Sequence, residues 1–237
     1  MGLRSVVLAT SISFSLAGSA SAAPLSISNI LGDWTNPAGG VPTIVNQPAQ
    51  GTDTARWGVP LNIDRSGYDF TPTAGAIAPA LGVPFSLGNF VHHNNPVTND
   101  DGSVITGIDY SISFSTNGVP SGLADTFHFD HNETPNAEPC PSPSAIPCDD
   151  IVTISSVNLN SIITVGSDVY FFNLLGFSTN GGATISSQFF SEEGAQNSAQ
   201  LYAMVTAQPV ITPEPGSMLL IGTGLVGIVT RLRRRSV

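Results

Sequence analysis

The sequence predicts an all-β protein: an antiparallel, jelly-roll-like β-sandwich with a cleaved N-terminal signal helix and a short C-terminal transmembrane helix. Charged residues make up only 10% of the 237 residues, whereas glycine (24) and proline (18) are frequent, which suits strands joined by many turns. Short runs in the middle of the chain alternate between apolar and polar residues with period two. An apolar segment at each end predicts the two helices and leaves roughly 190 residues for one domain.

The first 23 residues have the three parts of a secretory signal peptide. Arg4 supplies the positive charge, residues 6–17 are apolar, and Ala20-Ser21-Ala22 fits the A-x-A cleavage pattern. The alternative is a buried N-terminal helix. The sequence thus divides into a signal peptide, an exported domain and a C-terminal sorting segment, at residues 1–23, 24–209 and 210–237.

Strand signals in the first part of the domain are weak. Residues 25–84 are rich in proline and glycine, and within them Ile30–Trp34 and Thr54–Gly58 are each expected to form an edge strand. We expect the indole rings of Trp34 and Trp57 to cap or fill the core.

The clearest strand signal lies at residues 108–115, where four large apolar residues alternate with Asp109 and three serines. Such a strand has one buried and one solvated face. Asn117-Gly118 follows and predicts a hairpin turn. Further strands are expected from the same alternation at residues 126–130, 151–160, 161–165, 169–177, 183–190 and 200–206.

The two cysteines of the chain, Cys140 and Cys148, are expected to form a disulfide, because thiols of an exported protein meet an oxidising environment. Closing this nine-residue loop stabilises the fold by about 2.5 kcal/mol in the chain-entropy model. Two thiols without histidines at ligand spacing make a poor zinc site.

The C-terminus combines Pro213-Glu214-Pro215 with an uncharged stretch, residues 216–230, and the four arginines Arg231, Arg233, Arg234 and Arg235. A helix over this stretch spans about 22 Å, less than the roughly 30 Å of a hydrocarbon core, but thinning of the bilayer tolerates a short span. The arginines are expected to stay in the cytoplasm. The stretch would then stop in the inner membrane, with the domain facing outward; a plain tail anchor is the alternative.

These three parts, in this order, closely resemble the PEP-CTERM sorting signal. In that family an exosortase is thought to cut near the Pro-Glu-Pro and to release or re-anchor the protein at the cell envelope. The resemblance therefore implies an exosortase-type protease as a partner, in a Gram-negative bacterium that makes exopolysaccharide.

The charge of the domain excludes some partners. Between residues 24 and 212 only Arg56 and Arg65 oppose sixteen acidic residues, a net charge of −14. Such a field repels phosphate backbones, so nucleic acid is not an expected partner. It favours cations such as Ca²⁺, or basic partners.

Two sets of residues are candidate metal ligands. Four carboxylates bracket the disulfide loop and are candidates for one Ca²⁺ ion: Asp130, Glu133, Asp149 and Asp150. A weaker zinc candidate combines His92 or His93 with His128 and His131, with Asp130 as a ligand or supporting group. On a strand, His128 and Asp130 would share one face and His131 the other. The alternative is that the imidazoles bond loop backbone and hold a tight turn at residues 92–96.

Residues 85–97, Phe-Ser-Leu-Gly-Asn-Phe-Val-His-His-Asn-Asn-Pro-Val, resemble the signature of the THxN family of PEP-CTERM proteins, which is related to the choice-of-anchor type K domain. His92 and Asn94 match that signature, whereas Val91 replaces its threonine. The likeness extends over about residues 25–207. It implies architecture and location but no reaction.

The sequence lacks a Gly-x-Ser-x-Gly elbow, a phosphate-binding Gly-Lys motif and an H-E-x-x-H motif. We therefore expect a non-enzymatic envelope or matrix protein associated with exopolysaccharide, binding carbohydrate through exposed Trp34, Trp57 or Tyr68. The alternative is a secreted metal-dependent hydrolase that uses the His92–His131 region on polysaccharides or esters. A purely structural matrix component is a third hypothesis.

Overall fold

The structure is a computed structural model. It describes residues 24–39, 44–45, 51–61, 64–98, 102–135, 138–141, 144, 147–156, 161–166, 168–207 and 222–224. Two compact units are present, one of Ala23–Gln208 and one of Met1–Ala22 with Pro209–Val237. The expected signal helix lies outside the described residues, as does the expected C-terminal helix apart from one helical turn at Gly222–Gly224. No helix within the described ranges is long and apolar enough to cross a membrane.

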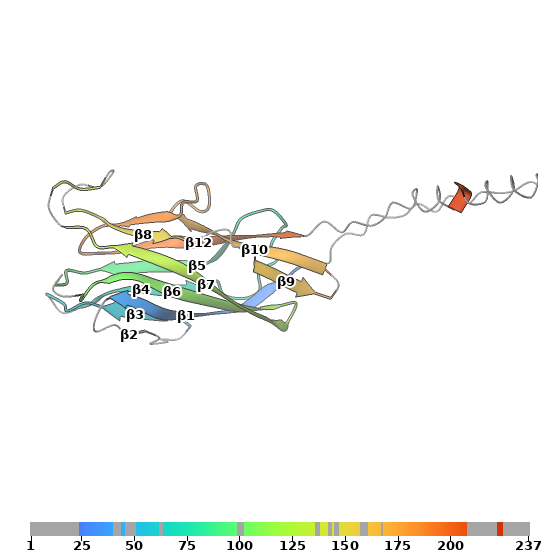
Figure 1. Ribbon diagram of the computed structural model, residues 1–237, viewed down its shortest axis with the longest axis horizontal. Helices are drawn as coiled ribbons and strands as arrows, with labels where there is room; N and C mark the ends of the chain where they lie inside the picture. The colour runs from blue at the N-terminus through green and yellow to red at the C-terminus, as the bar shows by residue number, and fades with distance from the viewer. Residues whose placement is uncertain are drawn as a thin grey trace, which may run out of the picture. The chain divides into compact units, whose positions relative to one another are not determined.

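The unit Ala23–Gln208 is an all-β sandwich of two antiparallel sheets (Figure 1). The first sheet has the strand order β1 (Ile27–Gly39), β6 (Ile105–Thr116), β7 (Val119–Asn132), β8 (Asp150–Ile154), β11 (Gln188–Ser191). The second has the order β2 (Ile44–Val45), β3 (Asp53–Trp57), β4 (Ser66–Pro72), β5 (Phe85–Asn94), β12 (Ala195–Ala207), β10 (Asp168–Ser178), β9 (Ser161–Val165).

The antiparallel sandwich confirms the predicted class, but the connectivity differs from a jelly roll. Strands β2 to β5 follow one another in the second sheet, and β6 to β8 in the first. Successive strands of a jelly roll instead form two Greek keys. Strands that follow one another in sequence commonly pair as neighbours, which produces meanders here; the β6–β7 connection is a tight turn, whereas the others are longer loops.

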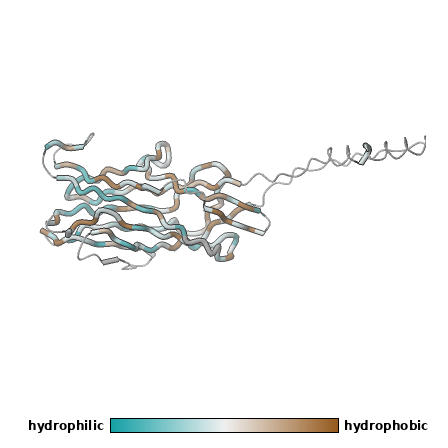
Figure 2. The backbone as a smooth tube through the Cα atoms, viewed as in Figure 1, coloured by the Kyte–Doolittle hydropathy of each residue, from teal (hydrophilic) through white to brown (hydrophobic). Residues whose placement is uncertain are grey.

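Period-two alternation explains the central hairpin. Strands β6 and β7 pair from Gly107 opposite Asp130 to Thr116 opposite Val119. The turn between them is Asn117-Gly118, as predicted, and both residues have positive φ (48° and 78°), the conformation of a tight hairpin turn. Hydrophobic and hydrophilic segments alternate along the strands of the sandwich (Figure 2).

Aromatic rings fill the space between the sheets. Trp34 of β1 lies 5.4 Å from Tyr68 of β4, and Phe90 of β5 lies 5.9 Å from Phe129 of β7 (ring centroids). Trp34, Trp57 and Tyr68 each have an exposed fraction of 0%. The expectation that Trp34 and Trp57 fill the core is confirmed. The hypothesis that these three rings bind carbohydrate at the surface is wrong, because their burial in the core leaves no ring face for a sugar.

Candidate functional site

The candidate site is a cluster of polar side chains buried between the sheets. Strand β5 points Leu87, Phe90, His92 and Asn94 inward, and the side chains of His92 and Asn94 are fully buried. The prediction of a tight turn at residues 92–96 is therefore wrong for His92–Asn94, because His92 and His93 pair with both β4 and β12 and Asn94 pairs with β12. A histidine and an asparagine occupy positions where apolar alternation predicts hydrophobic residues.

The histidine pair of the cluster comes from opposite sheets. His131 of β7 faces His92 of β5, with ring centroids 5.3 Å apart. The Oη atom of Tyr68 lies 2.6 Å from Nδ1 of His131, so this hydrogen bond orients the ring. The other nitrogen, Nε2, then faces carboxylates: it lies 3.2 Å from Oε2 of Glu133 and 3.9 Å from Oδ2 of Asp150.

Three carboxylates meet beside the histidines. Glu133 follows β7, Asp150 begins β8, and Glu193 lies in the turn that carries the chain from β11 to β12. A carboxylate oxygen of each lies within 4.8 Å of the others, and Asp150 also lies within 4.8 Å of a ring nitrogen of both His92 and His131. Asp150 is fixed by the backbone N–H of Thr134, which donates to its Oδ1 at 2.9 Å.

Burial and like charges disfavour ionisation throughout this cluster. Burial, together with repulsion from Glu133, raises the pKa of Asp150 above its usual range. Burial likewise raises the pKa of Glu133. For the histidines the effect is reversed: burial lowers the pKa of His131 to about 4, although Asp150 opposes this, and lowers the pKa of His92 well below its usual range. Without a cation, the cluster therefore favours neutral imidazoles and shared protons.

Several buried atoms of the cluster have no hydrogen-bond partner among the described residues: both ring nitrogens of His92, Oδ1 of Asn94 and Oδ2 of Asp150. A buried polar atom without a partner costs about 1–3 kcal/mol. A ligand bound at these atoms would therefore stabilise the fold most.

The structure separates the predicted metal ligands into two groups. His131, Glu133 and Asp150 come together with His92, but Asp130 and His128 lie on the opposite face of β7, where His128 bonds Asp109 at 2.7 Å. The prediction that His128 and Asp130 share one face and His131 the other is confirmed.

Two other candidate ligands are not part of the cluster. His93 faces outward on β5 and pairs with Asp69 at 2.7 Å. Asp149 is outside both groups of possible ligand atoms. Neither predicted set is therefore assembled as proposed, whereas a combination of the two is.

Sequence reasoning missed Glu193, which is distant from the other members in sequence. Its signal was the Ser191-Glu192-Glu193-Gly194 turn, but the position of a turn does not indicate which buried group it approaches. The disulfide was predicted correctly: Cys140 and Cys148 are bonded, with their Cα atoms 5.2 Å apart. Near this loop, the hydroxyl of Thr134 donates to the backbone oxygens of Cys148 and Asp149.

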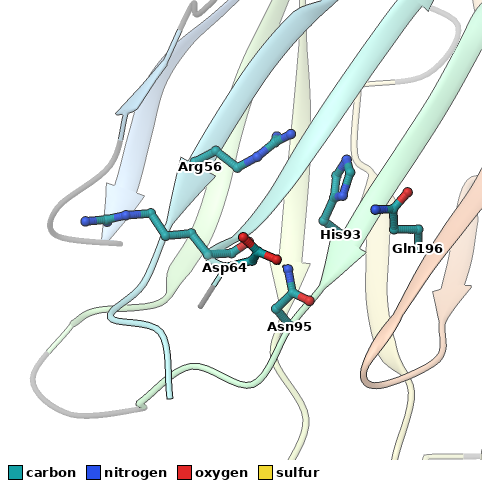
Figure 3. Close-up of a pocket in the computed structure, with 6 residues that line it drawn as sticks. Arg56, Asp64, His93, Asn95 and Gln196 are labelled. Atoms are coloured by element: carbon teal, nitrogen blue, oxygen red, sulfur yellow. The ribbon is translucent and has the colours of Figure 1, made fainter. Parts of the chain in front are cut away.

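A second feature lies on the outer face of the second sheet. A hollow of about 510 Å³ is lined by polar side chains from three strands, from the β3–β4 loop and from the residue directly after β5, namely Arg56, Asp64, Arg65, His93, Asn95 and Gln196. Figure 3 shows the labelled side chains of Arg56, Asp64, His93, Asn95 and Gln196 around this hollow. It contains both arginines of the region from residue 24 to 212.

Strand register accounts for the arrangement of the hollow. Arg56 of β3 is opposite Gly67 of β4, which is opposite His93 of β5, which is opposite Gln196 of β12. A Cβ atom on Gly67 would lie 2.5 Å from Cδ of Arg56. Glycine therefore lets the Arg56 side chain lie across β4, where its Nη1 donates to the Tyr68 carbonyl oxygen and contacts Asp69 Oδ1 at 2.6 Å.

The sandwich and its disulfide define a disulfide-bonded β domain, a class typical of exported proteins. Residues 212–235 match the family model of the PEP-CTERM protein-sorting motif. This motif indicates an exported protein that an exosortase sorts at the membrane to the cell envelope. A search of curated proteins found no match to the chain.

The matched segment contains Pro213, Glu214, Pro215 and the arginines Arg231, Arg233, Arg234 and Arg235, all of which lie outside the described residues. The likeness of residues 85–97 to the THxN family stays a prediction.

Proposed function

We propose that the protein is a non-enzymatic component of the envelope or extracellular matrix, whose sandwich associates with an acidic exopolysaccharide through the polar hollow on its outer face. The observation that carries the proposal is that the two arginines of an otherwise strongly acidic domain line the same hollow. The sorting motif supports the location, since it indicates an exported protein that is sorted at the membrane to the cell envelope.

The hollow offers the groups that a sugar acid requires. Arg56 and Arg65 supply N–H donors for a carboxylate, while Asn95 and Gln196 supply amides for hydroxyl groups. The framework is held in place by hydrogen bonds: Asn95 Nδ2 donates to the Arg65 carbonyl oxygen at 2.9 Å, and Arg65 Nη1 donates to the Gly58 carbonyl oxygen at 2.9 Å. The overall negative charge opposes binding of a polyanion, so we expect a modest affinity for each single site. Several protein molecules held on one surface would bind the same polymer more tightly than one molecule does.

Burial of the histidine and carboxylate cluster favours this reading over a metal-dependent hydrolase. The exposed fractions of His92, Asp150 and His131 are 0%, 0% and 5%. A hydrolytic metal needs an open coordination position that substrate and water reach. The described geometry offers a closed cluster instead.

Binding of the full-length protein to alginate, a polymer of uronic acids, tests the proposal, with dextran as the neutral comparison. We expect alginate to bind and Arg65→Gln to weaken binding by about tenfold or more, since a hydrogen bond to a charged group contributes about 1.5–3 kcal/mol. Affinity electrophoresis at a fixed salt concentration measures this change.

Gln188→Ala is a matched control, because this exposed residue of β11 lies in the other sheet. It should bind alginate as the unchanged protein does. Equal binding of alginate and dextran, or unchanged binding by Arg65→Gln, would contradict the acidic-saccharide proposal.

A further inference from the structure

We propose that His92, His131, Asp150 and Glu133 form a closed structural Zn²⁺ site that ties the two sheets of the sandwich together. His92 belongs to β5 of one sheet, and His131 and Asp150 to β7 and β8 of the other, with Glu133 directly after β7. A metal ion held by these four residues would cross-link the sheets at the end of the core near the disulfide loop.

The geometry is close to that of a tetrahedral site. A ring nitrogen of His92, a ring nitrogen of His131 and a carboxylate oxygen of Asp150 lie within 4.8 Å of one another. Ligand atoms of tetrahedral zinc are about 3.4 Å apart, so the side chains of His92, His131 and Asp150 need to move by less than about 1 Å. Glu133 Oε2 and His131 Nε2 are already 3.2 Å apart.

Two observations independent of the acidic groups point to a ligand. His92 is fully buried, and neither of its ring nitrogens has a hydrogen-bond partner among the described residues. A neutral imidazole has one donor and one acceptor, and a metal bond would satisfy the acceptor. In addition, Tyr68 bonds Nδ1 of His131 at 2.6 Å, the supporting contact that orients a histidine ligand.

The donor set selects the class of metal. Two imidazoles with carboxylates are typical ligands of Zn²⁺. Ca²⁺ instead takes six to eight oxygen ligands. In this cluster two of its coordination positions would be filled by imidazole nitrogens, which Ca²⁺ does not prefer. The burial of the ligands also favours a structural role, because structural zinc sites have four protein ligands and no open position.

Zinc would also resolve the electrostatic conflict of the cluster. Glu133, Asp150 and Glu193 bring three carboxylates within 4.8 Å of one another, with Asp150 buried and the two glutamates half-buried. A divalent cation removes much of the repulsion between them and keeps Asp150 and Glu133 ionised.

The test uses the full-length protein, exported into the periplasm of a bacterial host and purified in detergent. Mass spectrometry of metals should find about one zinc per chain. Removal of zinc with EDTA should lower the Tm by about 5–10 °C, the shift expected for a ligand present at about 100 times its Kd in a domain of this size. Added Zn²⁺ should restore the Tm, and added Ca²⁺ should not.

Neighbouring histidines provide a matched pair of variants. His92→Gln should lose the zinc, whereas His93→Gln, one residue away on the outer face of the same strand, should retain it. If His92→Gln retains as much zinc as His93→Gln, the metal is bound elsewhere and the proposal fails.

Asp150→Asn keeps the test decisive if His92→Gln does not fold. Asparagine preserves the size of the side chain and the oxygen that accepts from Thr134. If the site binds zinc, this variant should lose zinc and have the Tm of the EDTA-treated protein. In a metal-free network of shared protons, the substitution would remove a carboxyl group that is costly to bury, and the Tm would stay constant or rise. That result, or restoration of the Tm by Ca²⁺ in the unchanged protein, overturns the proposal.

Discussion

At the residue scale, the packing of Tyr110 depends on the absence of a side chain at Gly32. A Cβ atom on Gly32 would lie 1.6 Å from Oη and 2.1 Å from Cζ of Tyr110. The ring therefore occupies the space above the glycine, where its hydroxyl donates to Oδ2 of Asp53 at 2.7 Å. This contact links β6 of one sheet to β3 of the other.

Gly32→Ala should lower the free energy of unfolding by about 1–3 kcal/mol, because the added methyl group displaces a buried ring in a well-packed core. A loss of stability would be informative, because replacing glycine by alanine where the backbone is unstrained usually stabilises a protein. Urea unfolding measures the change.

Tyr110→Phe serves as the comparison: it removes the bond to Asp53 and part of the clash. The double variant should therefore lose less than the sum of the two single losses. Full additivity, or a Gly32→Ala protein as stable as the unchanged one, would show that the space above Gly32 is not limiting.

At the element scale, a row of charged side chains connects three adjacent strands on the outer face of the second sheet. Asp69 of β4 contacts Arg56 of β3 at 2.6 Å and His93 of β5 at 2.7 Å. Burial alone would raise the pKa of Asp69, but its bonds to His93 and Arg56 outweigh that effect, so the pKa of Asp69 is lowered. These ion pairs favour the register of β3, β4 and β5 that also places Arg56 and His93 beside the hollow.

This lowered pKa predicts acid sensitivity. The stabilisation from ionised Asp69 is fully present above the ordinary aspartate pKa of 3.8 and is lost as the pH falls through the lower pKa of the folded state. The urea midpoint of the unchanged protein should therefore fall more steeply below about pH 4 than that of Asp69→Asn. Measurements at neutral pH and at successive pH values below pH 5 provide the comparison, and parallel curves would refute this role of Asp69.

The strands predicted best are those whose inward residues are all apolar. In β6, Ile108, Tyr110 and Ile112 define the buried face by sequence alone. Strand β5 has the same alternation, but His92 and Asn94 take two inward positions, so the apolar pattern ends before the strand does. The predicted strand at residues 183–190 begins too early, since β11 covers only Gln188–Ser191.

The candidate site was predictable only within one local stretch. His131, Glu133 and Asp150 lie within twenty residues of one another around a loop, which the sequence indicated. Their association with His92 and Glu193 depends on how the two sheets face each other, and one sequence does not specify that pairing. A polar residue on an inward position is the signal that would have placed His92 in the cluster.

At the scale of the whole molecule, two units carry opposite charges. The unit Ala23–Gln208 contains two arginines and sixteen acidic residues, whereas the end of the other unit contains four arginines within five positions. The charge of the acidic unit repels polyanions, and under the proposed function the hollow lined by its two arginines is the exception. A basic cluster such as the terminal one suits the cytoplasmic side of a membrane. The matched sorting motif, residues 212–235, contains this arginine cluster.

Because Pro213-Glu214-Pro215 lies outside the unit Ala23–Gln208, substitution there should change sorting without changing the fold. We expect Pro213→Ala with Glu214→Ala to leave the chain uncut at the inner membrane, since the apolar segment and its arginines would remain attached. Fractionation and intact mass measure this: the variant should be heavier than the unchanged protein by the segment that processing removes, with the same Tm. Arg65→Gln, which alters only the sandwich, should be processed normally. If the double variant reached the envelope with the mass of the unchanged protein, the Pro-Glu-Pro would not be the processing signal, and the terminal segment would act as a plain anchor.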